Sequence, residues 1–238
     1  MRNKLFVLIA LIATAFLFSC AGKGDLEAAD IIACGTFNPE THICDKRDGN
    51  LYRITKKIDG QIWFAENLKY KPYETSSLCY GEKDENCEEY GRLYPWEEID
   101  ELCPEGWRVP GISDWEFLED RTGKKDSDNN IKSRKLWLPY PNENGNQIDV
   151  YVEDIYNFSA LPAGAYRIVY MDRVIEDQDE DCKDIEEWEN WGGVTESFGR
   201  IALFMSTSVN DFWSITNEPE MKFCVAKNSY RSVRCIKE

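Results

Sequence analysis

The sequence has 238 residues and a formal net charge of −16, with 44 Asp and Glu residues against 28 Lys and Arg residues. Because a protein with this net charge repels phosphate backbones, we expect no nucleic acid partner. The single histidine, His42, argues against His-rich zinc sites and leaves a serine or cysteine hydrolase only one candidate base. We expect His42 to be an exposed loop residue with no catalytic role.

The first 20 residues are typical of a bacterial lipoprotein signal. Arg2 and Lys4 precede an apolar run from Leu5 to Phe18, and Ser19 is followed by Cys20. This run is shorter than the roughly 20 residues that a membrane-spanning helix needs. We expect cleavage after residue 19, acyl chains on Cys20 that attach the protein to the membrane, and a location at the bacterial outer membrane or cell surface. The alternative is an uncleaved anchor in which the cysteine is incidental.

Eight further cysteines remain, and an even number in an exported chain predicts disulfides. No two of them have the C-x-x-C spacing, which argues against a zinc knuckle and against a thioredoxin-type redox motif. We therefore expect no metal and no cofactor. The eight are Cys34, Cys44, Cys79, Cys87, Cys103, Cys182, Cys224 and Cys235.

The chain after Cys20 begins with a tether and then a hairpin. Residues 21–33 are small, polar and acidic without a sustained period, and a local disulfide between Cys34 and Cys44 would close the turn-rich segment that follows. The segments 51–55 and 61–65 are apolar runs joined across Asp59-Gly60, which predicts a β-hairpin.

Two short helices are predicted in the middle of the chain, over residues 95–102 and 113–122. The first has apolar residues three positions apart. The second begins with a capping box, in which the Ser113 hydroxyl accepts from the Glu116 amide and the Glu116 carboxylate reaches back. Gly123 ends it. Its predicted core residues are Trp115 and Leu118.

The remainder predicts a long loop followed by strands. Residues 124–146 are polar, with Trp137 and Leu138 as an internal anchor. Five short apolar runs, bounded by Gly, Asn or Pro, predict strands over residues 166–170, 201–205, 212–215, 223–226 and 232–236. Two short helices with several short antiparallel strands and long loops indicate an α+β fold.

Residues 176–189 hold nine carboxylates and leave two alternatives open. Clustered oxygens suit calcium, but the ligand spacing of an EF-hand and its turn glycine are absent. We expect a solvated acidic loop.

Several motifs resemble the Fibrobacter succinogenes major paralogous domain, and they occur in that family's order. They are WFAENL at 63–68, YGRLYPW at 90–96, CPEGWRVP at 103–110, NFSALPAG at 157–164 and SVRC at 232–235. The resemblance assigns this domain to residues 45–238, after a signal peptide at 1–19 and a tether at 20–44. One departure is Met205, which stands where the family commonly has Trp.

The resemblance also extends, more distantly, to the C-type-lectin-like fold shared with formylglycine-generating enzymes. That fold brings its chain ends together, which implies a Cys103–Cys235 disulfide. Cys79–Cys87 would hold the turn between them, and Cys182–Cys224 is left by elimination. The tryptophans of these motifs are expected to pack in the core, and Arg92, Arg108 and Arg234 to form ion pairs with carboxylates.

These observations favour a surface-displayed, non-catalytic binding or structural module, whose ligand is a polysaccharide or an envelope protein. The family itself has no settled activity. The candidate ligand platforms are Tyr70, Tyr73, Trp188 and Trp191. The alternative is an extracellular enzyme, either a carbohydrate-active enzyme that uses two carboxylates or one that resembles formylglycine-generating enzymes and uses two reactive cysteines.

Overall fold

The computed structural model describes residues 34–72, 77–99, 101–123, 127–141, 144–170, 199–208, 212–216 and 223–238. The predicted signal peptide, Cys20, the tether up to residue 33 and the acidic segment 176–189 lie outside these residues. Among the helices that are described, none is long and apolar enough to cross a bilayer.

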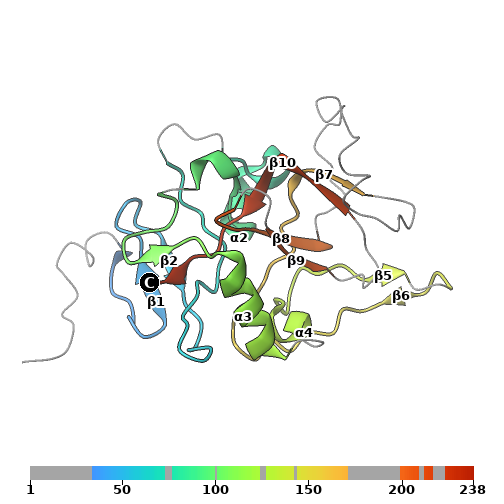
Figure 1. The fold of residues 1–238 in the computed structure, drawn as a ribbon, viewed down its shortest axis with the longest axis horizontal. Coiled ribbons are helices and arrows are strands. Elements are labelled where there is room, and N and C mark those ends of the chain that lie inside the picture. The colour runs from blue at the N-terminus through green and yellow to red at the C-terminus, as the bar shows by residue number, and fades with distance from the viewer. Residues whose placement is uncertain are drawn as a thin grey trace, which may run out of the picture.

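The architecture is α+β, as predicted, with short helices and short strands in small sheets (Figure 1). The α-helices are α2 (Asp84–Tyr90), α3 (Ile112–Thr122) and α4 (Ser127–Ile131), and the 3-10 turns are η1 (Tyr80–Glu82) and η2 (Trp96–Glu98). The strands are β1 (His42–Cys44), β2 (Leu51–Arg53), β3 (Leu93–Pro95), β4 (Trp107–Arg108), β5 (Tyr140–Pro141), β6 (Gln147–Ile148), β7 (Tyr166–Tyr170), β8 (Ile201–Met205), β9 (Phe212–Thr216), β10 (Phe223–Ser232) and β11 (Ile236–Lys237).

The largest sheet has five strands, and four of them follow the order β3-β10-β8-β9, with β7 also paired to β10. Strand β8 is buried along its whole length, as its continuous apolar sequence requires of a strand covered on both faces. It runs antiparallel to β9 and parallel to β10, with Ser232 opposite Phe204. Strands β7, β8 and β9 of this sheet were predicted in position, β10 was predicted only over residues 223–226, and β3 was not predicted. The predicted strand over residues 232–236 is wrong as a single strand, because β10 ends at Ser232 and β11 begins at Ile236. Between them, the carbonyl oxygens of Val233 and Cys235 accept the amides of Leu68 and Phe64.

The predicted hairpin is present. Asp59 and Gly60 both have positive φ, 48° and 97°, as a two-residue type I′ turn requires. Ile58 pairs with Gln61 and Ile54 with Phe64 in antiparallel bridges. Strand β2 also pairs with β1, and the C-terminus lies beside this pair (Figure 1).

Two clusters of buried side chains form the core. In the first, Trp63 and Trp115 have no exposed surface, and their rings lie 4.9 Å apart between α3 and the large sheet. The second gathers Tyr52, Phe64 and Met205 with the end of the chain. Met205 is fully buried, so at this position Met fills the core.

Three disulfides staple these parts together: Cys34–Cys44, Cys79–Cys87 and Cys103–Cys235. They are the three expected pairs whose sulfur atoms the structure describes. Cys182 and the side chain of Cys224 lie outside the described residues.

The predicted helix over residues 95–102 is wrong, since only the 3-10 turn η2 forms there. Glu101 has a positive φ of 114°, and the Arg47 guanidinium donates to the carbonyl oxygens of Glu101 and Leu102, both at 2.7 Å. These carbonyls therefore bond to a side chain instead of bonding within the segment.

The predicted capping box is also wrong in its residues. Helix α3 begins at Ile112 with Gly111 as its N-cap, and the Asp114 carboxylate accepts the Gly111 amide at 2.8 Å. Gly123 ends the helix in a left-handed conformation, as predicted, and Trp115 and Leu118 are in the core.

Residues 124–146 were predicted as loop but contain α4, β5 and the start of the β5–β6 pair. Helix α4 packs against α3, and the Asn130 amide donates to the carbonyl oxygen of Thr122. Such a five-residue helix has too little intrinsic stability to be visible in sequence, because its stability comes from tertiary contacts. Helix α2, which begins inside the Cys79–Cys87 loop and ends at Tyr90, was likewise not predicted.

Candidate functional site

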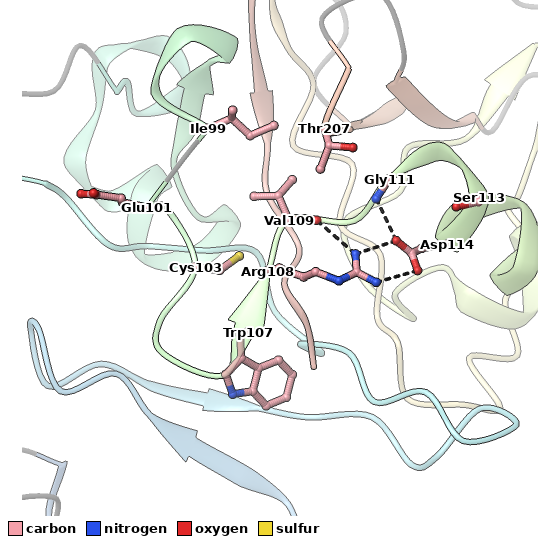
Figure 2. A pocket seen from close by; sticks show the side chains of 10 residues that line it. All are labelled: Ile99, Glu101, Cys103, Trp107, Arg108, Val109, Gly111, Ser113, Asp114 and Thr207. Atoms are coloured by element: carbon pink, nitrogen blue, oxygen red, sulfur yellow. Dashed lines mark hydrogen bonds and ion pairs between the residues drawn. The ribbon is translucent and has the colours of Figure 1, made fainter. Parts of the chain in front are cut away.

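The candidate site is a cleft of about 520 Å³ on the outer side of strand β4 (Figure 2). We call it the Trp107 cleft. Its walls come from Ile99, Glu101 and Cys103, from strand β4 and Val109, from the start of α3 and from Thr207. Both polar and apolar groups line it.

A rigid frame holds this cleft. Strand β4 pairs with β11, and the Cys103–Cys235 disulfide fixes the loop before β4 to the same C-terminal segment. On the other wall, Arg47 binds the backbone at residues 101–102 and is itself held by the buried Asp45 carboxylate at 2.7 Å. A frame fixed before a ligand arrives reduces the ordering cost of binding.

Arg108 and Asp114 form a two-bond ion pair at the rim. The Nη1 and Nη2 atoms of Arg108 donate to the two carboxylate oxygens of Asp114, at 2.7 and 3.0 Å. The Arg108 side chain is 44% exposed and that of Asp114 is 13% exposed. The hydrogen bond from Arg108 lowers the pKa of Asp114, and the same bond raises the pKa of Arg108. The carboxylate is therefore ionised at neutral pH.

Trp107 is half-buried at the edge of the cleft and points away from Arg108 in Figure 2. Its indole ring lies 4.8 Å from the ring of Phe64. Trp107 also lines a neighbouring cleft of about 620 Å³, which includes His42.

His42 was expected to be an exposed loop residue, and the structure corrects this expectation. His42 lies in strand β1, is half-buried and shares a 2.9 Å hydrogen bond with the hydroxyl of Thr41.

The polar groups of the Trp107 cleft suit recognition of a hydroxylated ligand. Beside the ion pair, Ser113 and Thr207 line the cleft and carry hydroxyls, and Glu101 lines its other side with its carboxylate pointing away from the ion pair (Figure 2). Such groups donate to and accept from sugar hydroxyls, and an indole edge or face supplies apolar contact. In the part of the chain that the structure describes, no group of three or more His, Cys, Asp or Glu side chains could hold a metal ion.

Tyr70, one of the predicted ligand platforms, is not among the residues that line the Trp107 cleft. One face of the Tyr70 ring is covered by the guanidinium of Arg47, 3.7 Å from the ring centre. Tyr73, Trp188 and Trp191 lie outside the described residues. From the sequence, Trp107 was expected to pack in the core and Arg108 to form an ion pair, so the cleft beside them was not predicted. The available signal was a Trp-Arg pair directly after the turn glycine Gly106, six residues before a helix-capping Asp.

Ion pairs with carboxylates were expected for Arg92, Arg108 and Arg234. Among the described residues, the structure confirms this for Arg108 and not for the other two. Arg92 donates to the hydroxyl and carbonyl oxygens of Ser77, both at 2.9 Å, and to the sulfur atoms of the Cys79–Cys87 disulfide. It therefore ties strand β3 to that disulfide.

Arg234 is completely buried and joins three of the motifs. Its guanidinium donates to the side-chain oxygen of Asn67 at 2.6 Å and to the carbonyl oxygen of Ser159 at 2.7 Å. It also donates to the carbonyl oxygens of Phe64 and Phe158. Burial lowers the pKa of Arg234. Because backbone carbonyls satisfy its donors, this arginine is part of the frame and is inaccessible to a ligand.

A family model of the Fibrobacter succinogenes major domain matches residues 57–237. The chain belongs to this family. The match covers the turn and second arm of the hairpin, the first buried cluster, all buried members of the second cluster except Tyr52, and the Trp107 cleft. It lies within the range 45–238 expected from the motifs. Neither a curated protein nor a solved structure shows significant similarity to the chain, so the C-type-lectin-like likeness stays a prediction.

Proposed function

We propose that this member of the Fibrobacter succinogenes major domain family is an exported, lipid-anchored surface protein whose domain binds a polysaccharide without catalysis. The Trp107 cleft is the proposed ligand site. The observation that carries the proposal is the Arg108–Asp114 pair, fixed bidentately beside a half-exposed indole in an open cleft. The lipid anchor at Cys20 would display this cleft outside the cell.

The chemistry of sugars supports this choice of ligand. A pyranose ring offers neighbouring hydroxyls that bond in pairs to planar side chains, and apolar C–H faces that pack on indole rings. The Arg108 guanidinium and the Asp114 carboxylate supply donors and acceptors side by side. Disulfides and the buried Arg234 keep this geometry fixed, so ligand binding does not have to order the site.

An extracellular glycosidase is the second candidate, because two carboxylates, Glu101 and Asp114, line the same cleft. A glycosidase needs one carboxyl group that remains protonated to donate a proton. The pKa of Asp114 is lowered, so Asp114 would have to act as the ionised partner. An enzyme that resembles formylglycine-generating enzymes would need Cys182 and Cys224, because the other six non-lipid cysteines form disulfides.

The test is a pull-down of the mature chain on insoluble and soluble plant and cell-wall polysaccharides, with Arg108→Gln as the variant. The matched control is Arg121→Gln, which removes another half-exposed arginine, paired with Asp59 at 3.0 Å. We expect Arg108→Gln to weaken binding about tenfold and the control to leave it unchanged. Absence of binding to every polysaccharide, or an equal effect of both variants, would refute this site.

The same samples are assayed for released reducing ends, which distinguishes the glycosidase. Product that disappears in a Glu101→Gln variant would replace the non-catalytic proposal with the enzymatic one.

The anchor is tested in parallel by labelling with a palmitate analogue. The label should appear in the wild type and be lost in Cys20→Ser, and a label retained in that variant would refute the anchor.

A further inference from the structure

A second cleft, of about 410 Å³, lies among residues 53–69, the end of α2, residues 133–136 and residues 154–161. We call it the Arg134 cleft. The buried Arg234 holds two of these segments, because it donates to Asn67 and to the carbonyl oxygen of Ser159. These two walls are therefore fixed by the frame described above.

The charges in this cleft oppose those of the chain. Four cationic side chains line it, although the whole chain carries −16. They are Arg53, Lys69, Arg134 and Lys135. Against them stand Glu66, Glu89 and Asp154. The cleft lining therefore holds one more cation than carboxylates, whereas carboxylates outnumber cations over the whole chain.

Two of the three carboxylates are already engaged. Glu66 pairs with Arg53 at 3.0 Å. Asp154 is buried and accepts both the amide and the hydroxyl of Ser159, at 2.9 and 2.6 Å. Glu89 is the remaining carboxylate.

Three cations remain without a carboxylate partner in the described residues, and these are Lys69, Arg134 and Lys135. The Arg134 guanidinium donates one Nη2 bond to the carbonyl oxygen of Glu153, which orients the group while leaving further donors. Three cationic side chains that line one cleft can bind an anionic group by charge-assisted hydrogen bonds.

We propose that the Arg134 cleft binds the carboxylate of a uronic acid unit, so that the polysaccharide recognised by this domain is an acidic one. The choice of a sugar over an acidic peptide rests on the proposed function. The size of the cleft is suited to one sugar unit, and the hydroxyls of Ser133 and Ser159 line it beside the cations. An acidic ligand must overcome the negative charge of the chain, and the positive cleft offsets that repulsion locally.

The experiment measures binding of galacturonate oligomers and of neutral galactose oligomers to the mature chain by calorimetry. The test variant is Arg134→Gln/Lys135→Gln. The matched control is Lys83→Gln/Arg121→Gln, which lowers the net charge by the same amount at exposed residues that do not line this cleft. A third variant, Arg108→Gln, reports on the Trp107 cleft.

We expect the wild type to prefer the uronate oligomer, and the test variant to weaken uronate binding about tenfold while the control changes it little. Loss of uronate binding in Arg108→Gln but not in the test variant would overturn this inference and leave the proposed function intact. Equal affinity for uronate and neutral oligomers would overturn it as well. Binding of inorganic phosphate or sulfate in preference to uronate would refute the ligand class.

Failure of the proposed function has a different signature. No oligomer or polysaccharide of either kind would then bind to the wild type, and the uronic acid assignment would fall with it. The free energy of unfolding of each variant is measured by urea titration, and all the variants named here should agree with the wild type within about 0.5 kcal/mol, because they are surface changes.

Discussion

Arg234 is fully buried and donates to Asn67 and to backbone carbonyl oxygens, whereas Arg108 is 44% exposed and donates to the carboxylate of Asp114. Burial lowers the pKa of Arg234, while the hydrogen bond with Asp114 raises the pKa of Arg108. The Cys103–Cys235 disulfide joins the two regions, since Cys235 follows Arg234 and Cys103 precedes β4.

This difference teaches which motif residues are free to meet a ligand. A guanidinium whose donors are satisfied by carbonyls holds chain segments together, and its removal leaves buried acceptors without donors. A guanidinium paired with a carboxylate at a cleft rim remains in contact with solvent, and its removal affects stability little. The two arginines should therefore separate in stability and in ligand binding.

The largest expected loss of stability comes from the disulfide that connects the two regions. Cys103→Ala/Cys235→Ala opens a loop with a sequence separation of 132, and the chain-entropy model gives a loss of about 5 kcal/mol. Cys79→Ala/Cys87→Ala opens a loop with a separation of 8 and should lose about 2.5 kcal/mol. Urea unfolding measures both losses. Equal losses would mean that loop length does not set the contribution of these disulfides.

The next largest effect is expected at Arg234. Arg234→Leu leaves the carbonyl oxygens of Phe64, Phe158 and Ser159 without this donor, and we expect a loss of about 3–5 kcal/mol. Arg108→Leu, the control on the exposed side, should lose at most about 1 kcal/mol. Urea unfolding of both variants gives the comparison directly. Similar losses for the two would contradict the assignment of Arg234 to the frame and Arg108 to the rim.

Gly91 sharpens the buried side of the comparison, because it packs against the residue that holds Arg234. A Cβ atom at Gly91 would lie 2.5 Å from the Asn67 Cβ, and the residue has a φ of +78°. We expect Gly91→Ala to lose about 3 kcal/mol through strain and overpacking. Gly60 has a φ of +97°, and a Cβ atom there would meet open space. Gly60→Ala should therefore lower the free energy of unfolding by about 1 kcal/mol, through backbone strain alone. Thermal or urea unfolding measures both losses of stability. A larger loss in Gly60→Ala than in Gly91→Ala would contradict this prediction.

The smallest effect is the pH dependence of the exposed pair. Because Arg108 lowers the pKa of Asp114 in the folded state, the pair stabilises the fold above the unfolded pKa of about 3.9, and this is lost as pH falls through the folded pKa. Asp114→Asn should therefore be less stable than the wild type by at most about 1 kcal/mol at pH 6, and the difference should shrink at lower pH. Urea titrations between pH 6 and about pH 2 measure it. A difference that grows on acidification would refute the pairing.

The hairpin and strands β7, β8 and β9 were predictable because their signals are local. The apolar run of β8 requires burial on both faces whatever its neighbours are, and Asp59-Gly60 favours a tight turn by its own backbone preferences. Helix α4 and the 3-10 turn η2 were not predictable, because α4 depends on its contacts with α3 and the chain after η2 is directed by Arg47, 54 residues away from Glu101.

The sequence by itself determined the α+β class, the family, the three disulfide pairs that the structure describes and the strands around the core. These follow from local patterns and motifs. The tertiary structure alone decided which arginine is buried and which is exposed, and that Trp107 and Asp114 line one cleft. The same residue type can satisfy its donors with carbonyls or with a carboxylate, and only the packing of distant segments sets which partners come within hydrogen-bond distance.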